Sequence, residues 1–239
     1  MSVSRPVRLA PRAGLQEERL ARLLYQQPTA AAMASEAVED AQLLGSLQLA
    51  GHDFAWDEVK ASRRGEPGAP PIGWLRAAQR AVPHDARMGA SALLAWHGAA
   101  TGGEGRWRRL ERIREGGPPP APPELVASRL ALLEEWLEAP SVRALSPAQQ
   151  AALALARIVE IGPFDDANGR VSRLAASHLM VRAGARPPIL VGADGERLQA
   201  VLAGAFRFET EPLTRLLEEA SERATSVMIQ ALGQSGQAG

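Results

Sequence analysis

Two stretches with the apolar spacing of helices are joined by a short charged segment, and this arrangement constrains the fold more than any other feature of the chain. Residues 149–161 and 171–183 each carry apolar side chains at helical spacing. The segment that joins them, residues 162–173, reads Gly-Pro-Phe-Asp-Asp-Ala-Asn-Gly-Arg-Val-Ser-Arg. Asn168 and Gly169 are predicted to turn the chain sharply there, because both residue types tolerate left-handed backbone angles. The pattern therefore predicts a helix, a tight loop and a second helix.

The residue types in the loop are those that bind phosphate. The second helix would point its free N–H groups and the positive end of its dipole at whatever the loop holds. Arg170 and Arg173 lie three residues apart and therefore on one helix face, and guanidinium groups bind phosphate oxygens in a bidentate fork. Asp166 supplies a carboxylate suited to a Mg²⁺ ion that bridges phosphates. Taken singly, an Asn-Gly pair is usually only a turn and a surface arginine only a solvated side chain, so the weight lies in their order and spacing.

The segment resembles the signature of the Fic family, His-Pro-Phe-x-(Asp/Glu)-Gly-Asn-Gly-Arg-x-x-Arg. The Pro, the Phe, the acidic residue, the Asn-Gly-Arg run and the final Arg match in order and spacing, and Ala167 replaces a Gly. The resemblance covers residues 88–182 well. It implies an all-α fold, a helical bundle with a small β-hairpin called the flap. Members of the family mostly transfer AMP from ATP to a protein hydroxyl.

The resemblance also implies roles for the matched residues. Asn168 and Gly169 would belong to a nest around the α- and β-phosphates, and Asp166 would be the Mg²⁺ ligand. Arg170 would contact the phosphates or stabilise the loop, and Arg173 would hold the γ-phosphate. The implied ligands are ATP and Mg²⁺, and the implied partners are a nucleotide and a protein target.

One departure from the signature is severe, because Gly162 stands where the family has its catalytic His. AMP transfer needs a base that takes the proton of the attacking hydroxyl, and glycine has no titratable side chain. We therefore expect a chain that binds nucleotide and transfers AMP poorly or not at all. Gly162 has two open explanations, a natural change and a laboratory substitution. Three alternative functions remain open: removal of AMP, action on a small-molecule substrate, and a non-catalytic, nucleotide-gated protein-binding module. His97 lies outside the loop, and we interpret it as structural.

Residues 105–114 are the one segment that argues for extended structure. Their apolar side chains recur every three residues among arginines, which fits a short helix as well as a strand. The resemblance favours the strand, because Gly105, Arg106, Trp107 and Arg108 look like the start of the flap. In the family the flap holds the protein target beside the active site by strand addition.

A second family pattern, (Ser/Thr)-x-x-x-Glu-(Gly/Asn), is similar to the run that starts at Ser35. Ser35 and Glu39 fall on one helix face, and Asp40 stands where Gly or Asn is usual. In the family this Glu pairs with the second Arg of the signature and blocks the γ-phosphate site. The resemblance thus predicts an ion pair between Glu39 and Arg173, whereas the alternative is a solvated Glu on an Ala-rich helix.

The expected organisation is one Fic domain with helical extensions. We expect an N-terminal helical region over residues 1–83 with the inhibitory helix at 29–49, the Fic domain at 84–207, and a C-terminal helix with a loose tail at 208–239. The 27 basic and 27 acidic residues give no net charge, so no nucleic-acid partner is expected. No run of about 20 apolar residues and no secretory signal is present, so we expect no membrane association. The absence of cysteine fits a cytoplasmic protein, and a homodimer is left open.

Overall fold

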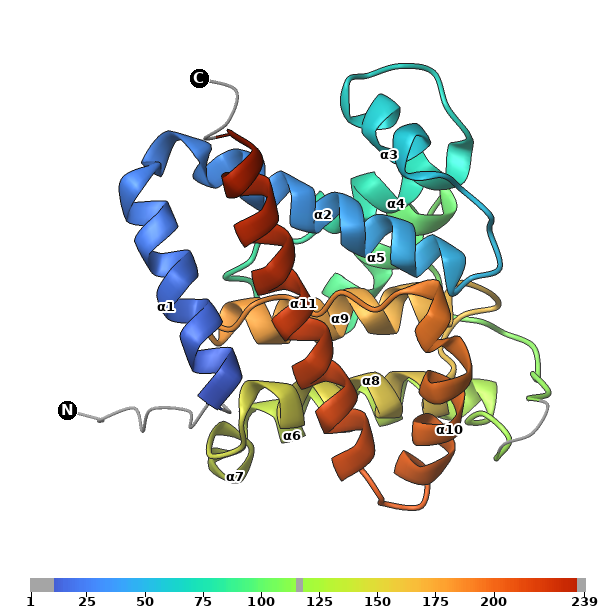
Figure 1. The fold of residues 1–239 in the computed structure, drawn as a ribbon. Helices are drawn as coiled ribbons and strands as arrows, with labels where there is room; N and C mark the ends of the chain where they lie inside the picture. The colour runs from blue at the N-terminus through green and yellow to red at the C-terminus, as the bar shows by residue number, and fades with distance from the viewer. Residues whose placement is uncertain (1–10, 115–117, 236–239) are drawn as a thin grey trace.

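Helices account for all regular structure in the residues that the computed structural model describes, 11–114 and 118–235 (Figure 1). The α-helices are α1 (Pro11–Gln26), α2 (Ala31–Gln48), α3 (Trp56–Arg63), α4 (Pro70–Arg80), α5 (Ala90–Thr101), α6 (Val126–Glu138), α7 (Pro140–Arg143), α8 (Pro147–Ile161), α9 (Asn168–Arg182), α10 (Gly195–Ala205) and α11 (Glu211–Ser235). The expected all-helical bundle is thus confirmed over these residues. The end of the expected loose tail, residues 236–239, lies outside them.

The centre of the bundle is the pair of helices on either side of the charged loop, α8 and α9. Helix α8 starts with Pro147 in its first turn and a capping box, in which the Ser146 hydroxyl accepts from Gln149 N at 3.2 Å and the Gln149 side chain accepts from Ser146 N at 2.9 Å. Buried small residues of α8, among them Ala151, Ala152 and Ala154, let the two helices approach closely. Each fully buried leucine or isoleucine beside them contributes about 1.5–3 kcal/mol. The loop is therefore held between two rigid elements.

The outer helices cover this pair from several sides. Helix α11 crosses α8 and packs on α2 and α1 as well (Figure 1). Helix α2 lies against the backbone of residues 189–191, and a Cβ atom at Gly45 would lie only 1.8 Å from Leu190 O. Glycine at this position therefore lets α2 sit directly over the C-terminal part of the core.

The expected flap hairpin is not formed in the described part of the flap segment. Residues 105–114 and 118–122 have no strand pairing. The second arm of a hairpin would begin Pro118-Pro119-Pro120-Ala121-Pro122, and proline has no N–H to donate to a ladder. The N–H group of Ala121 donates instead to Ile161 O at 3.2 Å. The proline run thus explains why this segment is extended without being a strand.

Within the described ranges, no helix is both long enough and apolar enough to span a bilayer.

Candidate functional site

The loop between α8 and α9 turns through two left-handed residues. Gly162 ends α8 with φ 57° and ψ 59°, and Ala167 precedes α9 with φ 55° and ψ 7°. The expectation that Asn168 and Gly169 make the turn was wrong, because α9 begins at Asn168 and both residues are helical. The prediction relied on Asn and Gly as the residue types that tolerate the left-handed region. In the structure, packing places Ala167 in that region.

Asn168 closes the loop with its side chain. Its Oδ1 accepts from Phe164 N at 3.0 Å, and its Nδ2 donates to Phe164 O at 2.7 Å. The Phe164 side chain is fully buried and lies between two rings, with the His97 ring stacked at 4.1 Å and the Trp107 ring at 5.2 Å between centroids. The loop is therefore preorganised by an internal amide clamp and an aromatic anchor.

The first turn of α9 presents its free N–H groups toward this loop. The backbone N–H of Val171 donates to Ala167 O at 2.9 Å, so the N–H groups just before it have no partner within the helix. Arg170 Nη1 donates to Ala100 O at 2.8 Å at the end of α5, and its Nη2 lies 3.9 Å from Asp166 Oδ2 in the loop. Of the two alternatives for Arg170, the structure favours stabilising the loop.

Arg173 lies between α9 and α2. Its Nε donates to Ser46 Oγ at 3.0 Å and its Nη2 to Ser46 O at 2.8 Å. A Cβ atom at Gly169 would lie 3.1 Å from Arg173 Nη1, so glycine at that position leaves room for the guanidinium. Burial, with a smaller contribution from the Arg170 charge, lowers the pKa of Arg173 to about 10. The guanidinium remains charged at neutral pH and has no carboxylate within ion-pair distance among the described residues, as a site for an anion requires.

The expected ion pair between Glu39 and Arg173 is not formed. Glu39 Oε2 lies 3.3 Å from Arg63 Nη2 and 3.7 Å from Arg80 Nη2. Glu39 precedes Ser46 by seven residues, which is about 10 Å along a helix axis. The position of α2 along its axis places Ser46 beside Arg173, so Glu39 lies too far away to pair with it. Ser35, on the same face of α2 as Glu39, lines the cavity beneath this helix.

Asp40, the residue that departs from the family pattern, explains why α2 keeps this register. Its carboxylate is buried and lies 2.9 Å from Arg63 Nη2 and 2.9 Å from Arg76 Nη1. These contacts tie α2 to α3 and α4. A glycine or asparagine there would lack the charge that holds both arginines.

Asp166, the expected metal ligand, is exposed at the mouth of the loop. Its Oδ1 lies 3.3 Å from His97 Nε2, and its Oδ2 lies 3.9 Å from Arg170 Nη2. Burial lowers the pKa of His97, and the hydrogen bond to Asp166 partly opposes this shift. No group of three or more His, Cys, Asp or Glu residues gathers as a metal site in the described residues. A single carboxylate suits Mg²⁺ that is held mainly by phosphates and water.

Arginines of the flap segment surround Gly162. Sequence analysis assigned Arg108 to target docking and gave Arg112 and Arg114 no role. Arg108 is buried, with its Nε donating to Gly162 O at 2.6 Å and its backbone N to Pro163 O at 2.9 Å. Arg112 Nη1 donates to Asp165 O at 2.6 Å, and Arg114 Nη2 donates to Val159 O. The signal that could have found them is the density of arginine in residues 106–114.

These contacts alter the roles expected for the flap residues. Trp107 packs on Phe164 and Arg108 is buried, so both hold the segment onto the loop. Gly105 approaches α5 so closely that a Cβ atom would lie 1.9 Å from Leu94 O. Of the four residues expected to start the docking flap, Arg106 alone is exposed.

Comparisons with known sequences agree with this geometry. A model of the Fic/DOC family matches residues 88–180, from α5 through the loop into α9. Two curated relatives called protein adenylyltransferase Fic are each 32% identical to the chain. The one from Drosophila grimshawi aligns over 127 residues, 53% of this chain and 26% of its own length, and the one from Caenorhabditis briggsae, fic-1, over 124 residues, 52% and 24%. The chain thus spans about a quarter of the length of these relatives.

Solved structures with the same fold extend the likeness to the flanking helices. A Fic domain-containing signaling protein from Bacteroides thetaiotaomicron superposes with a TM-score of 0.81 at 17% identity, over 93% of this chain and 98% of that one. Fic-1 (residues 134–508) from C. elegans superposes with a TM-score of 0.73 at 21% identity, over 93% and 74%. The match of the family model shows that residues 88–180 belong to the Fic/DOC family, and the solved structures show that the fold continues through the flanking helices.

Proposed function

We propose that the loop of residues 163–173 binds the phosphates of ATP and that the chain is of the protein adenylyltransferase type, with AMP transfer disabled at Gly162. The observation that carries this is the preorganised start of α9, where Asn168 closes the loop and the free N–H groups face it. The names of the curated relatives support the reaction type.

Each remaining group of the loop has a part in holding the nucleotide. Arg173 has its charge between α9 and α2 without a carboxylate partner in the described residues, so the γ-phosphate would supply the missing anion. Asp166 would hold Mg²⁺ together with the phosphates, and the ion would neutralise part of their charge. Arg170 and Arg108 would keep the loop in place through their backbone contacts.

The transfer itself lacks a proton acceptor at Gly162. In AMP transfer a protein hydroxyl attacks the α-phosphorus of ATP, a P–O bond forms, and pyrophosphate leaves. The hydroxyl proton needs a base, and loss of a general base typically costs about 10²–10⁴ in rate. The side chain nearest to a Cβ at Gly162, apart from Pro120, is Arg114, a cation that cannot accept the proton.

The protein target would dock on the exposed outer side of the flap segment. Leu110 is 75% and Ile113 is 90% exposed, although Arg108 and Arg112 fix the backbone beneath them. Exposed apolar side chains on a tethered, extended segment suit contact with another protein.

The test restores the base and controls for backbone strain. Gly162→His should label the chain or proteins in a lysate with ATP labelled at the α-phosphate. Gly162→Ala is the matched control, because it has the same left-handed strain and the same contact of its Cβ with Pro120, at 3.2 Å, without an imidazole. Calorimetry with Mg-ATP measures the ATP affinity of the parent chain and of both variants. Folded Gly162→His that binds ATP and labels no more than Gly162→Ala would refute the reaction type, and no binding at millimolar ATP would refute the loop as the site.

A further inference from the structure

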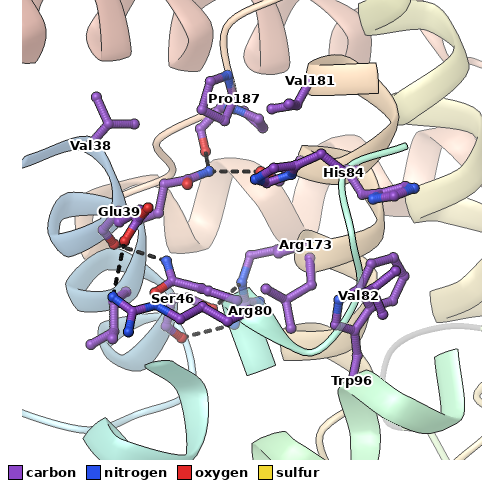
Figure 2. Close-up of a pocket in the computed structure, with 18 of the residues that line it drawn as sticks. Val38, Glu39, Ser46, Arg80, Val82, His84, Trp96, Arg173, Val181 and Pro187 are labelled. Atoms are coloured by element: carbon purple, nitrogen blue, oxygen red, sulfur yellow. Dashed lines mark hydrogen bonds and ion pairs between the residues drawn. The ribbon is translucent and has the colours of Figure 1, made fainter. Parts of the chain in front are cut away.

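A cavity of about 460 Å³ lies beneath α2, between this helix and the C-terminal half of α9 (Figure 2). Its size falls in the range of small-molecule sites. Residues 162–170 do not line it, and Arg173 is the residue that it shares with the phosphate-binding loop. Gln42 braces one wall, donating to Ser177 Oγ and to Pro188 O at 3.0 Å each. The cavity is thus a built space that meets the place proposed for the nucleotide at Arg173.

The charges around the cavity favour an anion. Three arginines line it, Arg80, Arg173 and Arg186, against one acid, Glu39. Arg80 is paired with Glu39 and Arg186 with Glu17, which leaves Arg173 for an anion. Among the described residues Arg173 has no carboxylate within ion-pair distance, and its partner is Ser46. A charged group without a counter-ion in a partly buried position gains most from an incoming carboxylate or phosphate.

The rest of the lining is apolar and would contact a hydrocarbon body. Apolar side chains from α2, α4, α8, α9, α11 and the α4–α5 connection face the space: Val38, Leu75, Val82, Leu155, Val181 and Met228. Figure 2 shows Trp96 beside Val82 at the end of the cavity opposite Val38. One acceptor, Gln79 Oε1, is buried without a partner in the part of the chain that the structure describes. Buried polar atoms in native proteins usually have partners, so this acceptor marks a place for a water molecule, since a carboxylate has no hydrogen to donate to it.

From these contacts we infer that the cavity beneath α2 binds a small amphipathic anion, a carboxylic acid with an apolar chain or ring, whose carboxylate meets Arg173 and whose body lies along the apolar wall. The ligand would contact both α2 and α9. This inference does not rest on the proposed AMP transfer, and its test uses no ATP.

The first experiment uses calorimetry on the full chain to measure how affinity depends on the charge and the shape of the ligand. Octanoate should bind at one site, octan-1-ol and octylamine should bind weakly, and acetate, a carboxylate without an apolar body, should bind much more weakly than octanoate. Arg173→Met, which keeps the volume of the side chain, should weaken octanoate by about tenfold or more. Arg182→Met is the matched control on the same helix, and it should leave the affinity within about twofold, because Arg182 pairs weakly with Glu138 and does not line the cavity.

A second experiment places the ligand without relying on the stability of the Arg173 variant. 8-Bromooctanoate should quench tryptophan fluorescence saturably, and Trp96→Phe should remove this quenching, since Trp96 lines the cavity. Equal binding of octanoate and octylamine, an unchanged affinity in Arg173→Met, or quenching that survives in Trp96→Phe would each overturn the inference. Acetate binding as tight as octanoate would overturn the amphipathic class, and no binding of octanoate at millimolar concentration would overturn the site.

Discussion

Ala167, like Phe208, is a non-glycine residue with a left-handed backbone. Its φ of 55° lies in the left-handed region, which costs an L-residue with a Cβ about 1–2 kcal/mol. The loop tolerates this cost because Asn168 and the buried Phe164 hold both sides of the turn. Strain of this kind is common where a backbone must present its N–H groups to a ligand.

Replacing Ala167 with glycine should therefore stabilise the protein. Relief of the left-handed strain exceeds the entropy of about 0.4–1 kcal/mol that glycine adds to the unfolded chain, so we expect a net gain of roughly 0.5–1 kcal/mol. Urea unfolding measures it. Ala183→Gly, at the other end of α9 where φ is −85°, is the control and should be neutral or destabilising. A loss of stability in Ala167→Gly would show that the turn carries no strain.

At the scale of elements, the flap segment is fixed by arginine side chains in place of a strand ladder. The Arg108 guanidinium donates to Gly162 O, Leu110 O and Ala121 O. One buried side chain thus joins both arms of the segment to the end of α8. Backbone carbonyls that strands would satisfy in a hairpin are satisfied here by guanidinium N–H groups.

Arg108→Met should release this segment and destabilise the fold. It leaves several buried carbonyls without donors, which we expect to cost about 2–4 kcal/mol. Arg112→Met is the matched control, because Arg112 is exposed and contacts the carbonyls of Phe164 and Asp165; it should cost less than about 1 kcal/mol. Chemical unfolding gives the energies, and trypsin cleavage after Arg109 and Arg114 reports release of the segment. Equal effects of the two variants would argue against Arg108 as the anchor.

At the scale of the whole molecule, a buried histidine joins the core to the connection before α5. His178 on α9 is buried, lies edge-on to Trp96, and its Nε2 donates to Ala86 O at 2.8 Å. Burial lowers the pKa of His178 below its usual 6.5, and the hydrogen bond to Ala86 opposes this only in part. The neutral ring is therefore the form that the folded protein prefers.

This preference predicts a loss of stability in acid. As the pH falls below about 6.5, the unfolded chain binds a proton at His178 before the folded chain does, so the free energy of unfolding falls by at most about 1.4 kcal/mol per pH unit. His178→Gln keeps a donor for Ala86 O and does not titrate. The difference in unfolding free energy between pH 7.5 and pH 5.5 should shrink in this variant relative to the parent chain. If the variant shows the same difference as the parent chain, groups other than His178 cause the loss of stability in acid.

The sequence by itself determined the helices and the place of the loop between α8 and α9. Apolar spacing, prolines at first turns and the Ser146–Gln149 capping box are local signals that need no tertiary contact. The order of residues in the loop likewise indicated Asn168 and Phe164, whose mutual hydrogen bonds span only four residues.

Tertiary structure alone decided the partners of the charged side chains and the course of the flap segment. Arg173 meets Ser46 and not Glu39 because Asp40, held by Arg63 and Arg76, sets the register of α2. These contacts join residues far apart in the chain, and a local pattern carries no information on which of several similar charges will meet. The described part of the flap segment forms no strand because its prolines lack N–H donors, and long-range arginine contacts satisfy the carbonyls instead. Local periodicity thus sets the elements, whereas packing between them sets the site.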